Sequence, residues 1–414
     1  MKKKFLAAAI GAMLIGGSAM AVEVAHGGKG DLLIAPMVMT GGGWTSEMKV
    51  VNTSTVDSAV AKVVFHAPDN SAELLDFLIF LSPGDVWVGT LSSNGTTTTM
   101  TSTDDSSLTV TSNGNGCPSR TGTAGLTANF SVGYTMAYAN IFETRMMRGL
   151  PTVAGTTGSP VVTKASILAA YSDACVAGTA ITTASTDNVL TGAVKLSNPL
   201  NGNMLVLPMT TFANYDNFSY HDVGSYTGFD SNLANTTKAA LEDAFWSSDF
   251  VVPYNNAAGQ FTFGTVTFPT KEAFTRSIGG SQYSPFPGSP RVGFAIRDEQ
   301  ENLLTAVIPG CTVSPCPIND PLVLAFPNEL NVFQVATGVK TTSSASVGTE
   351  GFTKGWVNVA VASEPSIVRS KTGNNNFGMI GLPALATYIQ WNFVGSALQG
   401  AWNYAPATFT PGNN

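Results

Sequence analysis

The stretch Trp44-Thr-Ser-Glu-Met-Lys-Val-Val-Asn52 places a different kind of residue on each side of the chain. Every second residue from Trp44 onward falls on one face, which carries Trp, Ser, Met and Val, whereas the other face carries Thr, Glu and Lys. This period of two residues is typical of a β-strand with one buried face. Ala59–Phe65 repeats the pattern, and the nearly continuous apolar run Leu74–Leu81 predicts a strand covered on both faces. We therefore expect these segments to form a β-sheet core.

Short strands of this kind recur along the chain, separated by clusters of Gly, Pro, Asn and Ser. Their spacing predicts a mostly β fold with two antiparallel β-sandwich domains, of the immunoglobulin or fibronectin type, and a few short helices. The expected domains are residues 22–187 and 188–414. Helices are expected at Lys164–Asp173, capped by Thr163, and at Thr237–Ser247, where each would cover a sheet edge or the mouth of a sandwich.

One pattern occurs in both halves of the chain. Phe65-x3-Asp69-x4-Leu74-Leu75 is matched by Phe294-x3-Asp298-x4-Leu303-Leu304, and each segment leads to a Pro-Gly pair. In each, a polar turn would join two strands. The pattern predicts the same hairpin used twice and, with it, two related domains; convergence of unrelated hairpins is the alternative.

The first 21 residues have the features of a secretory signal peptide. Three lysines precede an apolar run from Phe5 to Gly17, and Ala19-Met-Ala21 has the A-x-A form of a cleavage site. We expect the mature chain to begin near Val22, with an uncleaved anchor as the alternative. No later apolar stretch has spanning length, so we expect a secreted protein of the periplasm, cell surface or extracellular space, with no membrane span after the signal is removed.

The four cysteines are compatible with an oxidising compartment. Cys311 and Cys316 lie in a turn-rich segment, and Cys117 and Cys175 are the remaining pair. Four cysteines permit three pairings. We favour the disulfides Cys117–Cys175 and Cys311–Cys316, because the second pair is local. A metal site is the less favoured alternative, because the spacing of the cysteines is not that of zinc ligands.

The composition excludes several classes of partner. Charged residues make up only 11% of the chain, and its formal net charge is −7. Nucleic acids and anionic lipids are recognised through basic patches, so neither is an expected partner.

No familiar catalytic motif is present. The chain lacks G-x-S-x-G, the phosphate-binding P-loop, H-E-x-x-H and C-x-x-C. The histidines His26, His66 and His221 are expected in surface turns or loops, and the carboxylate pairs Asp104-Asp105 and Glu242-Asp243 on a loop and a solvated helix face. We therefore expect a protein that is not an enzyme, without a cofactor except for a possible calcium ion.

Calcium would bind in a loop rich in acidic residues. Asp216, Asp222 and Asp230 occur within a short segment together with asparagines. Hard oxygen ligands on extracellular loops commonly hold Ca²⁺. A plain loop of Asp and Asn turns is the alternative.

The same segment contains several aromatic residues. Tyr215, Tyr220, Tyr226 and Phe229 could form a platform on which a sugar stacks. The alternative is that these rings close the end of a sandwich.

Part of the chain resembles a group of known proteins. The segment Gly41–Pro83 is similar to secreted bacterial surface proteins rich in β-structure and of mostly unassigned role, and Leu190–Asn198 and Thr267–Lys271 look like further blocks of that type. The resemblance implies a β-sandwich surface protein and transfers no catalytic residue.

These observations predict an exported, non-catalytic protein of a bacterial envelope or cell surface. Its role would be structural, as in a surface layer, or adhesive, because a neutral surface and open sheet edges favour self-association or contact with other surface proteins and glycans. The alternatives are a glycan-binding module and an outer-membrane β-barrel, the latter suggested by the alternation in Tyr388–Phe393.

Overall fold

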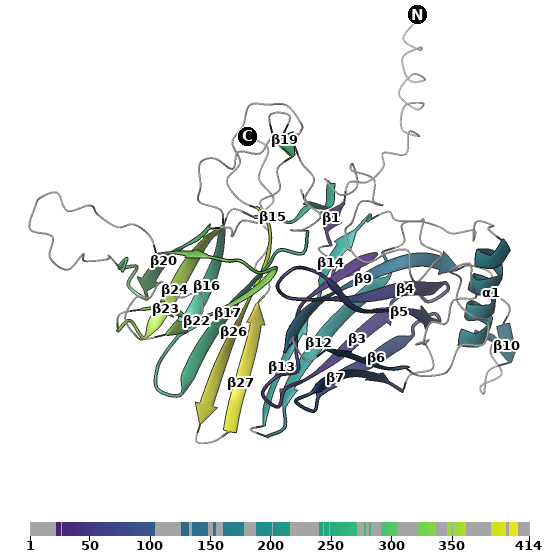
Figure 1. The fold of residues 1–414 in the computed structure, drawn as a ribbon, viewed down its shortest axis with the longest axis horizontal. Helices are drawn as coiled ribbons and strands as arrows, with labels where there is room; N and C mark the ends of the chain where they lie inside the picture. The colour runs from purple at the N-terminus through teal and green to yellow at the C-terminus, as the bar shows by residue number, and fades with distance from the viewer. Residues whose placement is uncertain are drawn as a thin grey trace, which may run out of the picture.

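A computed structural model supplies the structure of the chain and describes residues 22–25, 27–103, 126–131, 135–147, 152–154, 160–177, 188–200, 202–215, 240–242, 244–247, 249–270, 277–278, 281–282, 291–304, 322–336, 346–349, 351–361, 382–394 and 397–404. The fold is mostly β, with several antiparallel sheets and two helices, which confirms the predicted fold class at this level (Figure 1).

The first sheet has six antiparallel strands in the order β1-β14-β2-β9-β4-β5. Its strands are β1 (Glu23–Val24), β2 (Leu32–Met39), β4 (Ser58–His66), β5 (Glu73–Leu81), β9 (Met136–Met147) and β14 (Thr210–Ala213). The second sheet also has six antiparallel strands, in the order β13-β12-β3-β6-β7-β8. Its strands are β3 (Thr45–Asn52), β6 (Val86–Ser93), β7 (Thr97–Ser102), β8 (Leu126–Ser131), β12 (Leu190–Asn198) and β13 (Asn203–Pro208).

These two sheets face each other across one apolar core. Val63 and Phe65 enter it from the first sheet, and Met48, Val50 and Trp87 enter it from the second. The alternation predicted for β3 is thereby confirmed, because its apolar positions are buried while those between them are more exposed.

The predicted domain boundary between residues 187 and 188 does not separate the sheets. Residues 190–198 pair with β3, and residues 210–213 pair with β2. Strands β12, β13 and β14 therefore complete the sheets of the N-terminal half. Local sequence patterns could not show this, because β3 and β2, with which β12 and β14 pair, lie more than 130 residues earlier in the chain.

The C-terminal half contains a second pair of sheets. One has four antiparallel strands, in the order β16-β24-β20-β21: β16 (Asp249–Asn255), β20 (Arg291–Asp298), β21 (Leu322–Ala325) and β24 (Lys354–Val361). The other has five, in the order β23-β22-β17-β26-β27: β17 (Gln260–Thr267), β22 (Leu330–Ala336), β23 (Ser346–Gly348), β26 (Leu385–Val394) and β27 (Ala397–Tyr404). All pairings are antiparallel except that of β22 with β23. Phe294, Phe326 and Phe333 lie in the shared core.

Three two-stranded sheets complete the described β-structure. Their strands are β10 (Thr152–Ala154) with β11 (Pro160–Val162), β15 (Trp246–Ser247) with β25 (Leu382–Pro383), and β18 (Ser277–Ile278) with β19 (Ser281–Gln282).

The two halves share one strand order. In chain order, β2, β3, β4, β5, β6, β7, β9, β12 and β13 correspond to β16, β17, β20, β21, β22, β23, β24, β26 and β27. With this correspondence, β2-β9-β4-β5 matches β16-β24-β20-β21, and β13-β12-β3-β6-β7 matches β27-β26-β17-β22-β23. The last strand is an exception in direction, because β7 is antiparallel to β6 whereas β23 is parallel to β22. The shared order extends the resemblance between the halves well beyond one hairpin.

Local details agree with this correspondence. At the connection between the first two corresponding strands of each half, β2–β3 and β16–β17, a backbone N–H donates to a hydroxyl seven residues later. The donors and acceptors are Met39 and Ser46 Oγ (2.8 Å) in the first half and Asn255 and Thr262 Oγ1 (3.1 Å) in the second. Strands β4 and β5 form the first predicted hairpin. In the second, the turn after Asp298 returns to a bridge between Arg297 and Leu303.

Helix α1 (Lys164–Ala177) confirms the first predicted helix. It begins after Thr163, whose Oγ1 accepts a hydrogen bond from the backbone N–H of Ser166 (3.2 Å), as an N-cap does. Its apolar side packs on the outer face of the first sheet, where Tyr171 contacts Phe80 edge to face. The helix therefore lies over the edge strand β5 and extends onto β4 and β9, close to the predicted position at a sheet edge.

The second predicted helix ends earlier than expected. Residues 240–242 and 244 are helical, and β15 begins at Trp246, within the range predicted for the helix. Leu241 and Phe245 pack over Phe212 of the first sheet, on the same outer face as α1. With both segments in place, the first sheet is covered on both faces, as predicted for Leu74–Leu81 and confirmed for its residues from Phe77 onward.

The two halves contact each other through the five-stranded sheet. Leu330 and Ile389 join the apolar core of the N-terminal half. Thr267 Oγ1 donates to the carbonyl oxygen of Pro36 (3.1 Å), and the backbone N–H of Leu330 donates to that of Pro68 (2.9 Å). Strands β13 and β27 lie side by side at this junction (Figure 1). Among the described residues, no helix is both long enough and apolar enough to cross a bilayer.

Candidate functional site

A buried polar group of side chains lies on the outer face of the first sheet. We call it the hairpin network, because it is centred on the β4–β5 hairpin, and it consists of Lys62, His66, Ser71, Asp76, Tyr138 and Asn140. Lys62 is almost fully buried, and its Nζ lies 2.7 Å from Asp76 Oδ2 on the neighbouring strand. Burying a lysine is unfavourable unless its charge is balanced, so this ion pair fixes β4 against β5.

His66 is buried, which corrects our prediction that it lies at the surface. Its Nε2 lies 3.0 Å from Asn140 Nδ2, and its Nδ1 lies 3.0 Å from the carbonyl oxygen of Ser71. An amide nitrogen only donates, so Nε2 accepts, while Nδ1 carries the proton and donates to the carbonyl. Burial, with the nearby charge of Lys62, lowers the pKa of His66 to about 4. The ring is therefore neutral at physiological pH, with both nitrogens occupied.

The turn between the two strands is held by this network. Ser71 has a φ of 55°, which is uncommon for a residue other than glycine. Its Oγ is hydrogen-bonded to Tyr138 OH, and the Tyr138 ring stacks on His66 with centroids 4.9 Å apart. These contacts hold the strained turn against β9 and leave His66 with a structural role.

Glu73 gives the same hairpin a titratable group at its rim. Desolvation, the charge of Asp76 and a hydrogen bond to that carboxyl raise the pKa of Glu73 to about 7. Glu73 therefore takes up a proton near neutral pH, several pH units above an ordinary glutamate.

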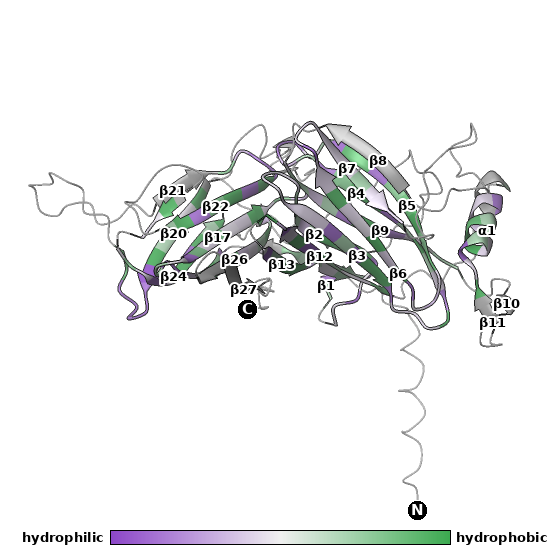
Figure 2. Ribbon diagram, turned by 90° about the horizontal axis from the view of Figure 1, so that it is seen from below, coloured by the Kyte–Doolittle hydropathy of each residue, from purple (hydrophilic) through white to green (hydrophobic). Residues whose placement is uncertain are grey.

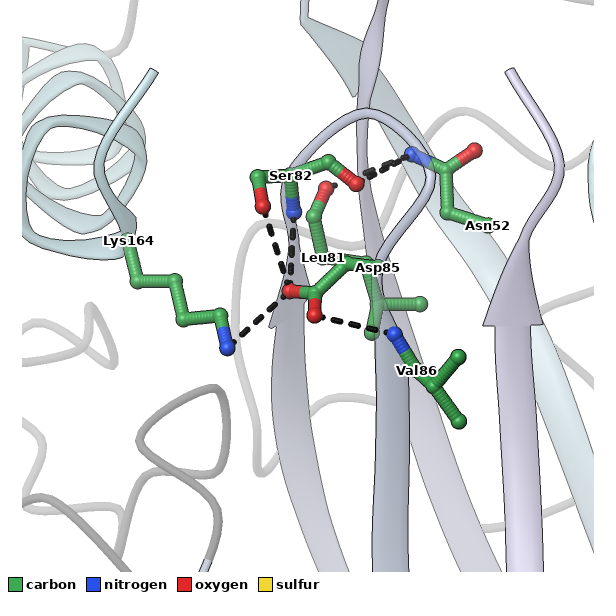
Figure 3. A network of polar contacts seen from close by, with 6 residues as sticks. All are labelled: Asn52, Leu81, Ser82, Asp85, Val86 and Lys164. Atoms are coloured by element: carbon green, nitrogen blue, oxygen red, sulfur yellow. Dashed lines mark hydrogen bonds and ion pairs between the residues drawn. The ribbon is translucent and has the colours of Figure 1, made fainter. Parts of the chain in front are cut away.

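A second polar cluster joins helix α1 to the sheets (Figure 3). Asp85 Oδ2 accepts from the backbone N–H of Ser82 (3.2 Å) and lies 3.1 Å from Lys164 Nζ, while Oδ1 accepts from the backbone N–H of Val86 (2.9 Å). Asn52 Nδ2 donates to the carbonyl oxygen of Ser82 (3.1 Å) on the other side of the turn. The Ser-Pro-Gly-Asp turn, expected only to end a strand, also anchors α1.

The outer face of the second sheet is an open surface. This face consists of the side chains opposite the core, which are Thr45, Glu47, Lys49, Val51, Val86, Val88, Thr90, Ser92, Thr97, Thr99, Thr101, Thr191, Ala193, Lys195, Ser197, Met204, Val206 and Pro208. It is rich in hydroxyls and valines, and only three of its side chains are charged. Met204 and Val206 are about half exposed. The apolar residues of strands β6 and β12 are coloured green in Figure 2.

The predicted ligand residues fall mostly outside the described residues. This holds for the aromatic residues Tyr220, Tyr226 and Phe229, the acidic residues Asp216, Asp222 and Asp230, the cysteines Cys117, Cys311 and Cys316, and also His26, His221, Asp104, Asp105 and Asp243. Cys175 lies in α1, but its side chain is not among those described. Within the described ranges, no group of three or more His, Cys, Asp or Glu side chains could hold a metal ion.

Besides His66, the side chains of Tyr215 and Glu242 are described, and both are buried. The Tyr215 ring lies 5.8 Å from that of Phe142, so it belongs to the packing alternative and not to a sugar platform. Glu242, expected on a solvated helix face, is also buried, because its short helix packs onto the first sheet.

Sequence reasoning missed both the hairpin network and the outer face. Lys62 gave a signal, since it is the one charged residue within the apolar segment Ala59–Phe65. Strand β13 gave another, because Asn203–Pro208 carries apolar residues on both of its faces. The partners of His66 on β9, Tyr138 and Asn140, gave none, since they lie more than 70 residues away in the sequence.

Comparison with family models, curated proteins and solved structures finds no match to the chain.

Proposed function

We propose that this chain is an exported, non-catalytic component of a bacterial envelope or cell surface, with a structural, surface-layer or adhesive role. The observation that carries this proposal is the outer face of the second sheet. It is broad, weakly charged and partly apolar, and a rigid sheet holds it in place. Exposed apolar surface of this kind marks sites where a protein contacts another molecule.

The architecture is consistent with a non-catalytic, structural role. We propose that each pair of facing sheets is a β-sandwich domain. Immunoglobulin domains place their first two strands in one sheet, whereas β2 and β3 lie in different sheets, as do β16 and β17. The likeness to the immunoglobulin type therefore rests on layering and not on strand order.

The hairpin network is consistent with this role. Within the network, the histidine and the lysine are both buried and engaged by neighbouring strands. Their arrangement stabilises a hairpin, and a general base would instead need a nitrogen within reach of a substrate proton.

Location is tested by surface proteolysis of intact producing cells. We expect a protease added to intact cells to release fragments of this chain, and the mature N-terminus to lie near Val22. Protection in intact cells, with cleavage only after the envelope is opened, would contradict a surface location. A full-length chain that stays in the cytoplasm would contradict export.

The contact role is tested with two variants in a deletion strain. Met204→Glu with Val206→Glu adds charge to the outer face of the second sheet, whereas Val251→Glu is a matched control on β16. Val251 is 48% exposed and Val206 51%, so both changes should be tolerated by the fold. We expect equal export of both chains and loss of surface retention or attachment only for the double variant. Equal attachment of the double variant and the Val251→Glu control would show that the outer face of the second sheet does not make the proposed contact.

A further inference from the structure

We propose that the outer face of the second sheet is a two-fold interface between two copies of this chain, with Glu47 of each copy against a lysine of the other. This inference rests on the proposed function and names the partner of the same surface. Its starting point is the arrangement of the three charged side chains, which is fixed by strand register.

The charges lie at the centre of the face and alternate in sign. Lys195 on β12 pairs in register with Glu47 on β3. Lys49 follows two residues after Glu47 on the same strand, with its Nζ 3.2 Å from Glu47 Oε1. Glu47 therefore has one lysine beside it across the strands and another beside it along the strand.

This pattern is complementary to itself. When two identical faces stack, the two-fold axis lies in the plane between them. An axis parallel to the strands, midway between β12 and β3, places Lys195 of each copy opposite Glu47 of the other. An axis perpendicular to the strands, between Glu47 and Lys49, places Lys49 of each copy opposite Glu47 of the other. In either arrangement two equivalent ion pairs form, and no lysine faces another lysine at the axis.

Apolar side chains flank these charges on both sides. Val206 lies beside Lys195 on β13, and Val88 lies beside Lys49 on β6. With the axis parallel to the strands, Pro208 of one copy meets Val88 of the other. With the perpendicular axis, Val206 meets Pro208. Both arrangements bury apolar area next to the ion pairs, which is the composition of a protein interface with a few central charges.

The face is large enough for a dimer of moderate affinity. Strands β13, β12, β3, β6 and β7 are about 20 to 30 Å long and lie about 4.8 Å apart, so together they cover roughly 600 Å² in projection. A standard interface buries about 800 Å² per partner. Because the available area is near the lower end of that class, we expect association that depends on protein concentration.

The proposal is tested by sedimentation and light scattering of the exported full-length chain over a wide range of concentration. We expect a monomer–dimer equilibrium for the wild type. Glu47→Lys should weaken it by about tenfold or more, because the two axis pairs become repulsive. Lys195→Glu or Lys49→Glu, added to Glu47→Lys, should restore it, and the variant that does so identifies the axis. Val251→Glu should behave as the wild type.

Two outcomes would overturn the interface. One is a wild-type chain that stays monomeric at every concentration, and the other is a dimer that Glu47→Lys leaves unchanged. Circular dichroism and thermal unfolding of each variant show whether it folds, and Val206→Glu offers a second test if Glu47→Lys does not. A monomer that is still accessible to protease on intact cells would refute the dimer and leave the proposed envelope role standing.

Discussion

His66 shows how one residue can make the stability of the hairpin depend on pH. Its folded pKa of about 4 lies below the ordinary value of 6.5. Between these pH values the unfolded chain binds a proton at this position and the folded chain does not, so stability falls as the pH falls through this window. Below pH 4 both states are protonated and the loss is complete.

We therefore expect wild type to lose about 3 kcal/mol relative to His66→Gln between pH 6.5 and pH 4. Chemical denaturation of both proteins at a series of pH values measures the difference. The comparison removes the contribution of carboxylates common to both. If the stabilities of wild type and His66→Gln changed equally with pH, His66 would titrate normally in the folded chain.

Glu73 makes stability depend on pH in the opposite direction from His66. Its folded pKa of about 7 lies above the ordinary value of 4.5, so the folded chain binds the extra proton in this window. The stability it contributes is fully present below pH 4.5 and is lost as the pH rises through 7. Glu73→Gln should therefore be more stable than wild type at pH 8, and equal to it near pH 4.5.

The size of the Glu73 effect is limited by solvent. The side chain is exposed, so screening reduces the gain from Glu73→Gln at pH 8 to about 1 kcal/mol. The same denaturation series measures it. A variant that is less stable than wild type at pH 8 would show that the charged form of Glu73 is favourable.

At the scale of elements, Asp85 connects a turn to a helix. Asp85→Ala removes the acceptors of two backbone N–H groups and the anion beside Lys164. We expect a loss of about 2 kcal/mol, since each hydrogen bond contributes about 1 kcal/mol. Lys164→Ala removes only the ion pair and should cost less than about 1 kcal/mol. Equal effects of the two substitutions in thermal unfolding would place the stabilisation in the ion pair and not in the turn.

The elements themselves were largely predictable from local pattern. The alternation in β3, the apolar run of β5 and the Thr163 cap of α1 each depend on residues that are neighbours in the sequence. The repeated Phe-Asp-Leu-Leu pattern also pointed to a relation between the halves, which the shared strand order now supports.

Partners distant in the sequence were not predictable. His66 looked like a surface turn residue because its neighbours Asn140 and Tyr138 belong to β9. The boundary after residue 187 failed for the same reason, because β12 pairs with β3 across a gap of more than 130 residues. The outer face became recognisable only when register had placed Glu47 beside Lys195.

For the whole molecule, the junction between the halves determines cooperativity. Leu330 is buried and belongs to the apolar core of the opposite half. The two halves should therefore unfold in a single calorimetric transition. Leu330→Asp should split it in two, whereas Leu330→Ala should cost about 2–4 kcal/mol.

Leu303→Asp is the matched control for the junction, because Leu303 is partly exposed and lies in the turn after β20. It should leave a single transition at nearly the wild-type temperature. Two transitions in the wild type itself would show that the halves unfold independently despite the contacts of Leu330.

Strand β2 lies between β9 and β14, and β14 ends at Ala213. During synthesis, residues 32–39 emerge early, yet their hydrogen-bonding neighbours follow about one hundred and about one hundred and eighty residues later. Such distant pairing slows acquisition of the native state, because loop closure precedes the gain from contact. The apolar strand β2 thus stays unpaired until these neighbours have been made, and a chaperone that shields residues 32–39 would protect the nascent chain from aggregation.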